Sequence, residues 1–223
     1  MTLRRPTSLQ SLLHVSAADN KPTAIVLAGH NGSGKSTLWY DRLAEGLQIP
    51  LVNADRLTLS LLPNPDENLK LRPWAARLRD QDERWQRLSQ DGVQLFMGLI
   101  MDQEMSFAFE TVFSHWQRQA DGTIRSKTDT IVALQEHGYF AILLFVGLAN
   151  PELSILRVAT RKSQGGHDVP EAKLRSRFPR TQEAIKMAST IADMTLMFDN
   201  SRGMQDAELV EVAGLWLSKV API

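Results

Sequence analysis

The sequence of 223 residues has no cysteine and no net charge, because 25 lysines and arginines balance 25 aspartates and glutamates. The lack of cysteine excludes disulfides, thiolate catalysis and zinc fingers, and it fits a reducing compartment. Zero net charge gives no overall field that would attract nucleic acid or an anionic membrane. No apolar run approaches 18 residues, and Leu12-Leu13 is too short an apolar centre for a signal peptide. We therefore expect a soluble, cytoplasmic protein without membrane or nucleic-acid partners.

The length and the apolar patterns indicate how the chain is organised. A content of 43% hydrophobic residues in 223 fits one domain better than two. Because residues 1–22 show only weak periodicity, we expect an N-terminal arm over 1–22 and one domain over 23–223. Apolar runs of strand length alternate with helical patterns, which predicts an α/β fold with three layers and a doubly wound, mostly parallel sheet. The five expected strands cover residues 23–28, 49–53, 106–111, 139–147 and 194–198.

Helical periodicity fills the segments between these strands. An apolar stripe that we interpret as core lies on one helical face at Trp74, Leu78, Trp85 and Leu88. A second helix is expected from about Val93 to Met101, and a last one from about Met204 to Val220. The segment Asn150-Pro151-Glu152 is typical of a helix start.

The most informative stretch runs from Thr23 to Leu38. An apolar strand is followed by a loop with glycines at positions 29, 32 and 34, and Lys35-Ser36 opens the expected helix. Such glycines let successive backbone N–H groups converge on a polyanion, and the helix directs its positive dipole end to the same point. The pattern is that of a P-loop, which binds phosphate. The alternative is a plain glycine-rich turn between a strand and a helix.

The P-loop interpretation assigns roles to individual residues. The lysine of a P-loop reaches the β- and γ-phosphates, and the hydroxyl that follows it ligates Mg²⁺. Here these residues are Lys35 and Ser36, so ATP and Mg²⁺ are the expected cofactors. The residues expected to bind the nucleotide are Gly29, His30, Asn31, Gly32, Ser33, Gly34, Lys35, Ser36 and Thr37.

Two motifs that accompany many P-loops are missing. The strand that ends in Leu143-Leu144-Phe145-Val146 carries no acid, so the usual Walker B aspartate is absent. The base-reading Asn-Lys-x-Asp pattern of GTPases is absent too, because Asn20-Lys21-Pro22-Thr23 lacks the aspartate. A small-molecule kinase becomes the leading class.

Two acidic residues follow expected strands at their carboxyl ends, where open α/β sheets bind ligands. A kinase can use a carboxylate near the phosphates to orient and deprotonate the acceptor hydroxyl, and Asp55 is the candidate base. The alternative role of Asp55 is to cap the turn that begins at Arg56. Glu110 ends the third strand, where an acid favours a ligand contact over a solvated face.

The even charge balance hides a polarised chain. Residues 151–190 carry a net charge of +4, whereas residues 41–110 carry −4. Within the basic segment, Gln164-Gly165-Gly166-His167-Asp168-Val169-Pro170 separates two helical patterns. This arrangement predicts a lid that closes cationic groups over a transferring phosphoryl group. The alternative is a solvated helical hairpin without a functional role.

Six segments together resemble the zeta toxin family of P-loop kinases. They are Gly29-His30-Asn31-Gly32-Ser33-Gly34-Lys35-Ser36-Thr37, Asn53-Ala54-Asp55, Phe107-Ala108-Phe109-Glu110-Thr111, Phe145-Val146-Gly147-Leu148, Gly165-Gly166-His167-Asp168-Val169-Pro170 and Phe198-Asp199-Asn200-Ser201. The resemblance covers roughly residues 23–202 and is closest to the short, stand-alone bacterial branch. It implies ATP-dependent phosphorylation of a sugar hydroxyl, with UDP-N-acetylglucosamine the family's known substrate, and often an antitoxin partner.

The resemblance also implies site residues. The catalytic group comprises Lys35, Asp55 and a phosphate-facing arginine, either Arg157 or Arg161; Ser36 is the metal ligand, and Asn200 joins the nucleotide contacts. The implied substrate-binding residues are Asp55, Glu110, Thr111, His167 and Arg177. The sequence departs from the longer toxins at His167, which occupies the place of a second arginine ahead of Pro170. Either Arg175 or Arg177 compensates, or the substrate differs.

Two other functions stay open. One is a kinase for another nucleotide, an antibiotic or a nucleic-acid end. The other is a regulatory module that binds nucleotide, forms a complex and turns over little. Measurable phosphoryl transfer to a small acceptor separates the module from the enzymes.

Overall fold

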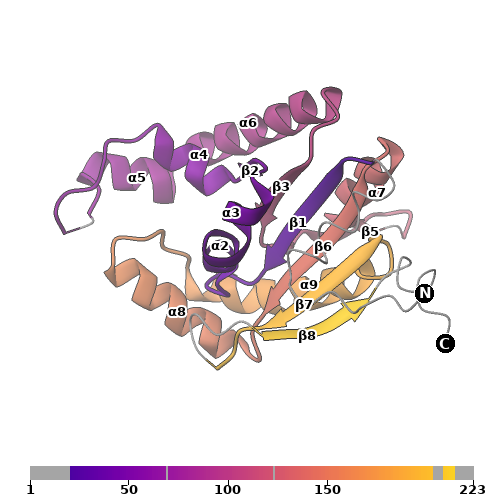
Figure 1. The fold of residues 1–223 in the computed structure, drawn as a ribbon. Helices are drawn as coiled ribbons and strands as arrows, with labels where there is room; N and C mark the ends of the chain where they lie inside the picture. The colour runs from indigo at the N-terminus through magenta and orange to yellow at the C-terminus, as the bar shows by residue number, and fades with distance from the viewer. Residues whose placement is uncertain (1–20, 69, 123, 203–207, 214–223) are drawn as a thin grey trace.

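A computed structural model describes residues 21–68, 70–122, 124–202 and 208–213 (Figure 1). The strands of the main sheet are β1 (Thr23–Gly29), β2 (Leu51–Val52), β3 (Phe107–Thr111), β6 (Phe140–Gly147), β7 (Met194–Asp199) and β8 (Glu208–Ala213). They lie in the order β2-β3-β1-β6-β7-β8, and all neighbours run parallel except β7 and β8. The expected α/β fold with a mostly parallel sheet is confirmed, and the sheet has one strand more than the five expected.

The sixth strand corrects a prediction. The pattern from about Met204 to Val220 predicts a helix, but Glu208–Ala213 pairs antiparallel with β7. That prediction is wrong over these six residues because the edge of β7 offers a hydrogen-bonding partner that local periodicity does not reveal, and β-branched residues such as Val210 suit a strand. The rest of the expected helix lies outside the described residues, as does the expected arm up to residue 20.

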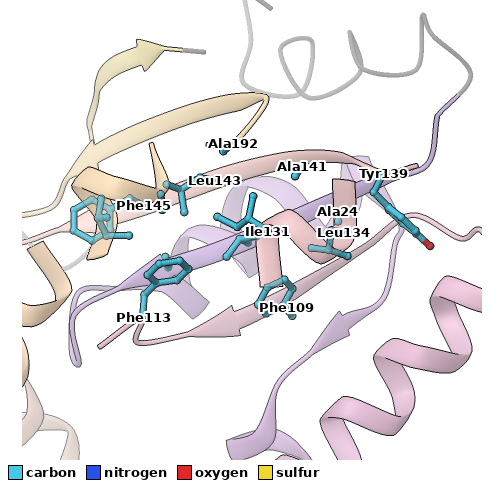
Figure 2. Close-up of a cluster of buried hydrophobic side chains, with 14 of the residues drawn as sticks. Ala24, Phe109, Phe113, Ile131, Leu134, Tyr139, Ala141, Leu143, Phe145 and Ala192 are labelled. Atoms are coloured by element: carbon cyan, nitrogen blue, oxygen red, sulfur yellow. The ribbon is translucent and has the colours of Figure 1, made fainter. Parts of the chain in front are cut away.

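Both faces of the sheet are covered, which explains the continuous apolar runs of its central strands. On one face, Ala24 of β1 belongs to a buried cluster with Ile131 and Leu134 of α7 (Thr128–Glu136), as Figure 2 shows. On the other face, Ile25 of β1 packs in a cluster with Trp39. Neighbouring residues of β1 therefore point into different layers, as expected for a strand with a period of two.

Helices fill the connections between the strands. They are α2 (Lys35–Leu38), the π-helix η2 (Trp39–Leu43), α3 (Ala44–Leu47), α4 (Ala54–Ser60), α5 (Pro73–Gln81), α6 (Glu83–Asp102), α7, α8 (Pro151–Ser163) and α9 (Glu171–Ala188). A separate hairpin of β4 (Trp116–Arg118) and β5 (Ile124–Ser126) follows β3 in the chain. Within the described part of the chain, no helix has both the length and the apolar content to cross a bilayer.

The helices before β3 differ from the expectation. The side chain of Asp82 accepts hydrogen bonds from two backbone N–H groups in the first turn of α6, so the helical stretch breaks there into α5 and α6. α6 then continues through residues 93–101, which do not form a separate helix. The interpretation of the apolar stripe as core is wrong at two of its positions, because Trp74 is 47% exposed and Leu88 is 61% exposed.

Two segments extend from the sheet on either side of α2 (Figure 1). Residues 53–106 contain α4, α5 and α6, and we call them the β2–β3 insertion. Residues 151–188 form the α8–α9 hairpin, whose helices are separated by the expected loop at residues 164–170. Each segment starts where a parallel strand ends, β2 for the insertion and β6 for the hairpin. The fold thus places acidic and basic segments around the same end of the sheet.

Candidate functional site

The loop after β1 has the glycine-dependent shape that the sequence predicts. A Cβ atom at Gly29 would lie 2.4 Å from the carbonyl oxygen of Val146, so no side chain fits there. Gly32 and Gly34 have positive φ angles of 70° and 90°, which residues with a side chain rarely adopt. Gly34 is the N-cap residue of α2, which continues through η2 and α3 to residue 47. The strand, loop and helix therefore form the expected phosphate-binding geometry.

Two side chains hold the backbone of this loop. The buried amide of Asn200 donates to the carbonyl of Ser33 at 2.7 Å, and the hydroxyl of Ser154 in α8 donates to the carbonyl of Asn31 at 2.7 Å. The sequence predicts Asn200 among the nucleotide contacts, and in the structure its side chain binds the backbone of the P-loop. Ser154 carries no motif, and sequence reasoning missed it.

The ring of His30 packs between β6 and α9. It stacks on Phe178 with ring centroids 4.0 Å apart, and it meets the edge of Phe145. Burial, followed by the charge of Lys35, lowers the pKa of His30 to about 3. The amide nitrogen of Gln182 lies 3.2 Å from Nε2, which fits a neutral ring because an amide nitrogen only donates. The side chain of His30 thus anchors the loop to α9.

Lys35 is buried and held by its own loop. Its ammonium donates to the carbonyls of Gly29 at 3.1 Å and His30 at 3.0 Å. Burial lowers the pKa of Lys35, the charge of Glu110 opposes this shift, and the charge of Arg161 adds to it. The like charges of Lys35 and Arg161 repel each other, and an anion bound at the loop would relieve this repulsion.

Glu110 links the P-loop to the neighbouring strand. Its Oε2 accepts hydrogen bonds from the hydroxyl of Ser36 at 3.0 Å and from the amide of Asn53 at 2.7 Å. Its Oε1 lies 3.8 Å from the Lys35 ammonium. The parallel pairing of β3 with β1 explains this meeting, because it brings the carboxyl end of β3 beside the loop. Glu110, expected as a substrate contact, shares the environment of the expected metal ligand.

The donor set at Ser36 suits Mg²⁺. A hydroxyl and a carboxylate oxygen are hard ligands, which Mg²⁺ prefers. Among the described residues, no group of three or more His, Asp or Glu side chains could enclose a metal ion. Mg²⁺ usually takes one or two protein ligands and completes its octahedron with waters and substrate phosphates. Ser36 and Glu110 would hold the ion.

The structure contradicts the capping role considered for Asp55. The cap of α4 is Asn53, whose side chain accepts a hydrogen bond from the backbone N–H of Arg56 at 3.1 Å. Asp55 lies in the first turn of α4 with an exposed side chain. Its charge opposes the lowering of the pKa of Lys35 and of Arg177. The role of Asp55 as a base stays a prediction.

The two candidate arginines of α8 have different surroundings. Arg157 is buried, and its Cβ would lie 3.1 Å from a Cβ at Gly32, so its stem packs against the P-loop. Burial lowers the pKa of Arg157, and the charge of Asp199 opposes the shift. Arg161 is the one whose charge acts on Lys35. Both arginines stay candidates to face a phosphate.

The two candidates on α9 also separate. Arg175 is exposed and pairs with Glu152 at 2.7 Å and Glu171 at 2.9 Å. Arg177 is less exposed; burial and then the charge of Arg180 lower its pKa, and the charge of Asp55 opposes the shift. Arg175 thus ties α9 to α8, and the contact of Arg177 with a substrate stays a prediction.

The remaining predicted residues lie at the margin of the site. The ring of His167 is hydrogen bonded to Asp80 of α5, with Nδ1 2.7 Å from the carboxylate oxygen. The hydroxyl of Thr111 accepts a hydrogen bond from the backbone of Phe113 at 3.2 Å. Thr37 follows Ser36 in α2 and is half-buried. Their ligand contacts stay predictions.

Comparisons with known proteins agree with this geometry. The sequence model of the zeta toxin family matches residues 9–206. A search of curated proteins found no match.

Several solved structures share the fold. A chain of the PezAT chromosomal toxin–antitoxin system of Streptococcus pneumoniae is 16% identical with a TM-score of 0.56, covering 90% of this chain and 80% of that chain. A chain of the AvrRxo1-ORF1:-ORF2 structure with ATP is 16% identical with a TM-score of 0.58. That alignment covers 91% of this chain but 62% of the other, so the latter protein is substantially longer. At these identities the likeness concerns the fold.

Proposed function

We propose that this chain, which belongs to the zeta toxin family, uses MgATP to phosphorylate a hydroxyl group of a nucleotide sugar. UDP-N-acetylglucosamine is the first acceptor to test, since the sequence resembles kinases of that substrate. The observation that carries the proposal is the meeting of Lys35, Ser36 and Glu110 at a P-loop whose glycines leave room for phosphate. A plain glycine-rich turn between a strand and a helix would not require these three side chains to lie together.

The cationic groups provide the binding and the electrostatic part of the reaction. Lys35 lies in the loop and Arg161 comes from α8, with its charge acting on Lys35, so we expect both to contact a bound triphosphate. Phosphoryl transfer depends mainly on positioning and on charge stabilisation, which buried cations supply well. Mg²⁺, when bound, bridges phosphate oxygens and neutralises charge that develops on them.

Asp55 would orient and deprotonate the acceptor hydroxyl. This carboxylate follows β2, is exposed to an incoming ligand, and lies in the field of Lys35 and Arg177. A carboxylate in that position accepts the hydroxyl proton as the oxygen attacks the γ-phosphorus. Arg177 would then contact an anionic part of the acceptor, such as the diphosphate of a nucleotide sugar.

We also infer a protein antitoxin as a partner. The support is family membership together with the shared fold of a chain from the PezAT toxin–antitoxin system. Under this proposal the phosphorylation itself is toxic, and the partner neutralises it. Growth of bacteria that express the chain, compared with the Asp55→Asn variant, tests the toxic effect.

The decisive experiment follows labelled phosphate. Purified protein is incubated with γ-labelled MgATP and a panel that contains UDP-N-acetylglucosamine, other UDP and GDP sugars, free sugars, nucleosides, an aminoglycoside and 5′-hydroxyl RNA. Label on a nucleotide sugar, absent with Lys35→Ala, is the expected result. Label on RNA or on an antibiotic instead would show that the acceptor is not a nucleotide sugar. Tight MgATP binding with no labelled product would favour the regulatory module.

A further inference from the structure

Arg79 of α5 holds the loop of the α8–α9 hairpin. Its Nη1 donates to the carbonyl of Gly165 at 3.0 Å, and its Nη2 donates to the carbonyl of Gly166 at 3.3 Å. The guanidinium also makes a two-point contact with Asp80, at 2.7 Å and 2.9 Å. The side chains of Arg79 and Asp80 are only 11% and 20% exposed. One arginine therefore joins two segments that are 86 residues apart in the sequence.

Asp80 adds a second connection to the same loop. Its Oδ1 lies 2.7 Å from Nδ1 of His167. Partial burial raises the pKa of Asp80, but hydrogen bonds from Arg79 and then from His167 outweigh burial and lower it. The carboxylate is therefore charged at neutral pH and attracts both of its partners. We call Arg79 and Asp80 the α5 clamp.

The clamped loop in turn touches Arg161. The carbonyl of His167 accepts a hydrogen bond from Nη2 of Arg161 at 3.1 Å. The stem of Arg161 crosses directly over Gly166, where a Cβ would lie 2.5 Å from its Cγ. In the described part of the chain, the buried Nε of Arg161 has no hydrogen-bond partner. Arg161 is thus held at Nη2, while its Nε–H has no partner among the described residues and its charge acts on Lys35. These features suit a contact with an anion.

We propose that Arg79 and Asp80 are positioning residues, which hold the turn at residues 165–167 so that Arg161 faces the phosphates bound by the P-loop. This inference rests on the proposed function, because it concerns the placement of Arg161 in that reaction. It also changes the expected behaviour of the lid. The sequence predicts that this segment closes as a lid, and here the carbonyls of Gly165 and Gly166 in its loop are held by the clamp.

The clamp has a further consequence for the order of events. α5 belongs to the β2–β3 insertion, which begins beside Asp55, whereas Arg161 belongs to the opposite hairpin. Because the clamp links the two segments, any movement of the insertion on acceptor binding would shift the turn that holds Arg161. The clamp joins the acceptor side and the phosphate side of the site in one closed arrangement.

A first experiment tests the clamp without any reaction. Hydrogen exchange of the amides in residues 164–168 is measured in nucleotide-free protein for the parent, Arg79→Gln and Asp80→Asn. Arg77 is an exposed arginine on the same helix, so Arg77→Gln is the matched control. Exchange should become at least about fivefold faster in both clamp variants and stay unchanged in the control. Equal exchange in all four proteins would overturn the clamp.

A second experiment tests positioning. Calorimetry gives the dissociation constants of Mg-AMPPNP and MgADP, whose ratio reports contacts with the γ-phosphate and needs no acceptor. Arg79→Gln and Arg161→Ala should each reduce the preference for the triphosphate by roughly 5- to 10-fold. If Arg79→Gln does not fold, as judged by circular dichroism, the isosteric Asp80→Asn carries the test.

The double variant decides between positioning and simple stabilisation. If Arg79 acts through Arg161, Arg79→Gln should reduce the preference no further in an Arg161→Ala background. A further loss of the same size in both backgrounds would overturn the proposal. If labelled ATP shows no transfer, the proposed function fails. Coupling in this binding cycle would still support the clamp's control of Arg161.

Discussion

The ammonium of Lys35 lies 3.8 Å from a carboxylate oxygen of Glu110, while it donates hydrogen bonds to two carbonyls of its own loop. The lysine is thus engaged by the protein at the place where phosphates are expected. Binding of a triphosphate would replace the two neutral carbonyl acceptors with charged phosphate oxygens, which attract an ammonium more strongly.

Replacement of this lysine should abolish transfer and spare the fold. Burial and the charge of Arg161 both disfavour the charged form of Lys35, so Lys35→Ala should not unfold the protein. Transfer should fall by at least about 100-fold, the size seen when a group that stabilises the transition state is removed. Turnover assays and thermal unfolding check the two parts. An unchanged turnover with equal MgATP affinity would contradict the prediction.

Asp55→Asn should separate catalysis from stability. The amide keeps the shape of the side chain but removes the base, so transfer should fall by roughly 10²- to 10⁴-fold while MgATP still binds. Stability should stay the same, because Asn53 provides the cap of α4. Steady-state kinetics and chemical denaturation measure the two effects. Transfer within a few-fold of the parent would remove Asp55 from the catalytic residues.

Glu110→Gln should change the Mg²⁺ dependence of activity. Glu110 accepts the hydrogen bond of the Ser36 hydroxyl, so the loss of its charge weakens the environment of the metal. The Mg²⁺ concentration for half-maximal transfer should rise by about 10- to 100-fold, as it does when groups around a metal site are changed. Glu136→Gln, at the exposed end of α7, is the control. A shift of equal size in both variants would exclude a specific role.

His30 should make the stability of the protein depend on pH. Its pKa is about 3 in the folded protein, against an ordinary value of 6.5, so the unfolded chain takes up the proton first as the pH falls. The free energy of unfolding should therefore decrease by about 1.4 kcal/mol per pH unit between about pH 6 and pH 4 from this group.

His30→Phe is the matched variant for that measurement. It keeps a ring against Phe178 but cannot be protonated, so its slope over the same pH range should be smaller. Denaturant titrations at several pH values give both slopes. Identical slopes in the parent and the variant would show that His30 contributes nothing to the acid sensitivity.

Local pattern was enough to predict the centre of the fold. The strand from Thr23, the glycines of the loop and the helix at Lys35 are neighbours in sequence, and each favours the same structure. The edge strand at Glu208–Ala213 could not be predicted this way, because its formation depends on the free edge of β7. Likewise, Asp82 interrupts the helical stretch through a capping bond that periodicity does not register.

The site was predictable in part for the same reason. Asn53 directly follows β2 and Glu110 lies near the end of β3, so the sequence placed both at carboxyl ends of strands, whereas their contact depends on the pairing of β2 with β3. The α5 clamp could not be inferred, since Arg79 and Gly165 have no relation in sequence. The surroundings of the two α8 arginines also could not be inferred: Nη2 of Arg161 donates to the carbonyl of His167, whereas the stem of Arg157 packs against Gly32.

Two glycines of this chain differ in how well they tolerate substitution. A methyl group at Gly29 would clash with the backbone of β6. An alanine there would require the centre of the sheet to widen, so we expect substitutions at this position to be rejected. A methyl group at Gly98 in α6 would meet open space beyond the helix itself, and alanine there should favour the helix by about 1 kcal/mol. Among descendants of this sequence, position 29 would stay fixed while position 98 varies.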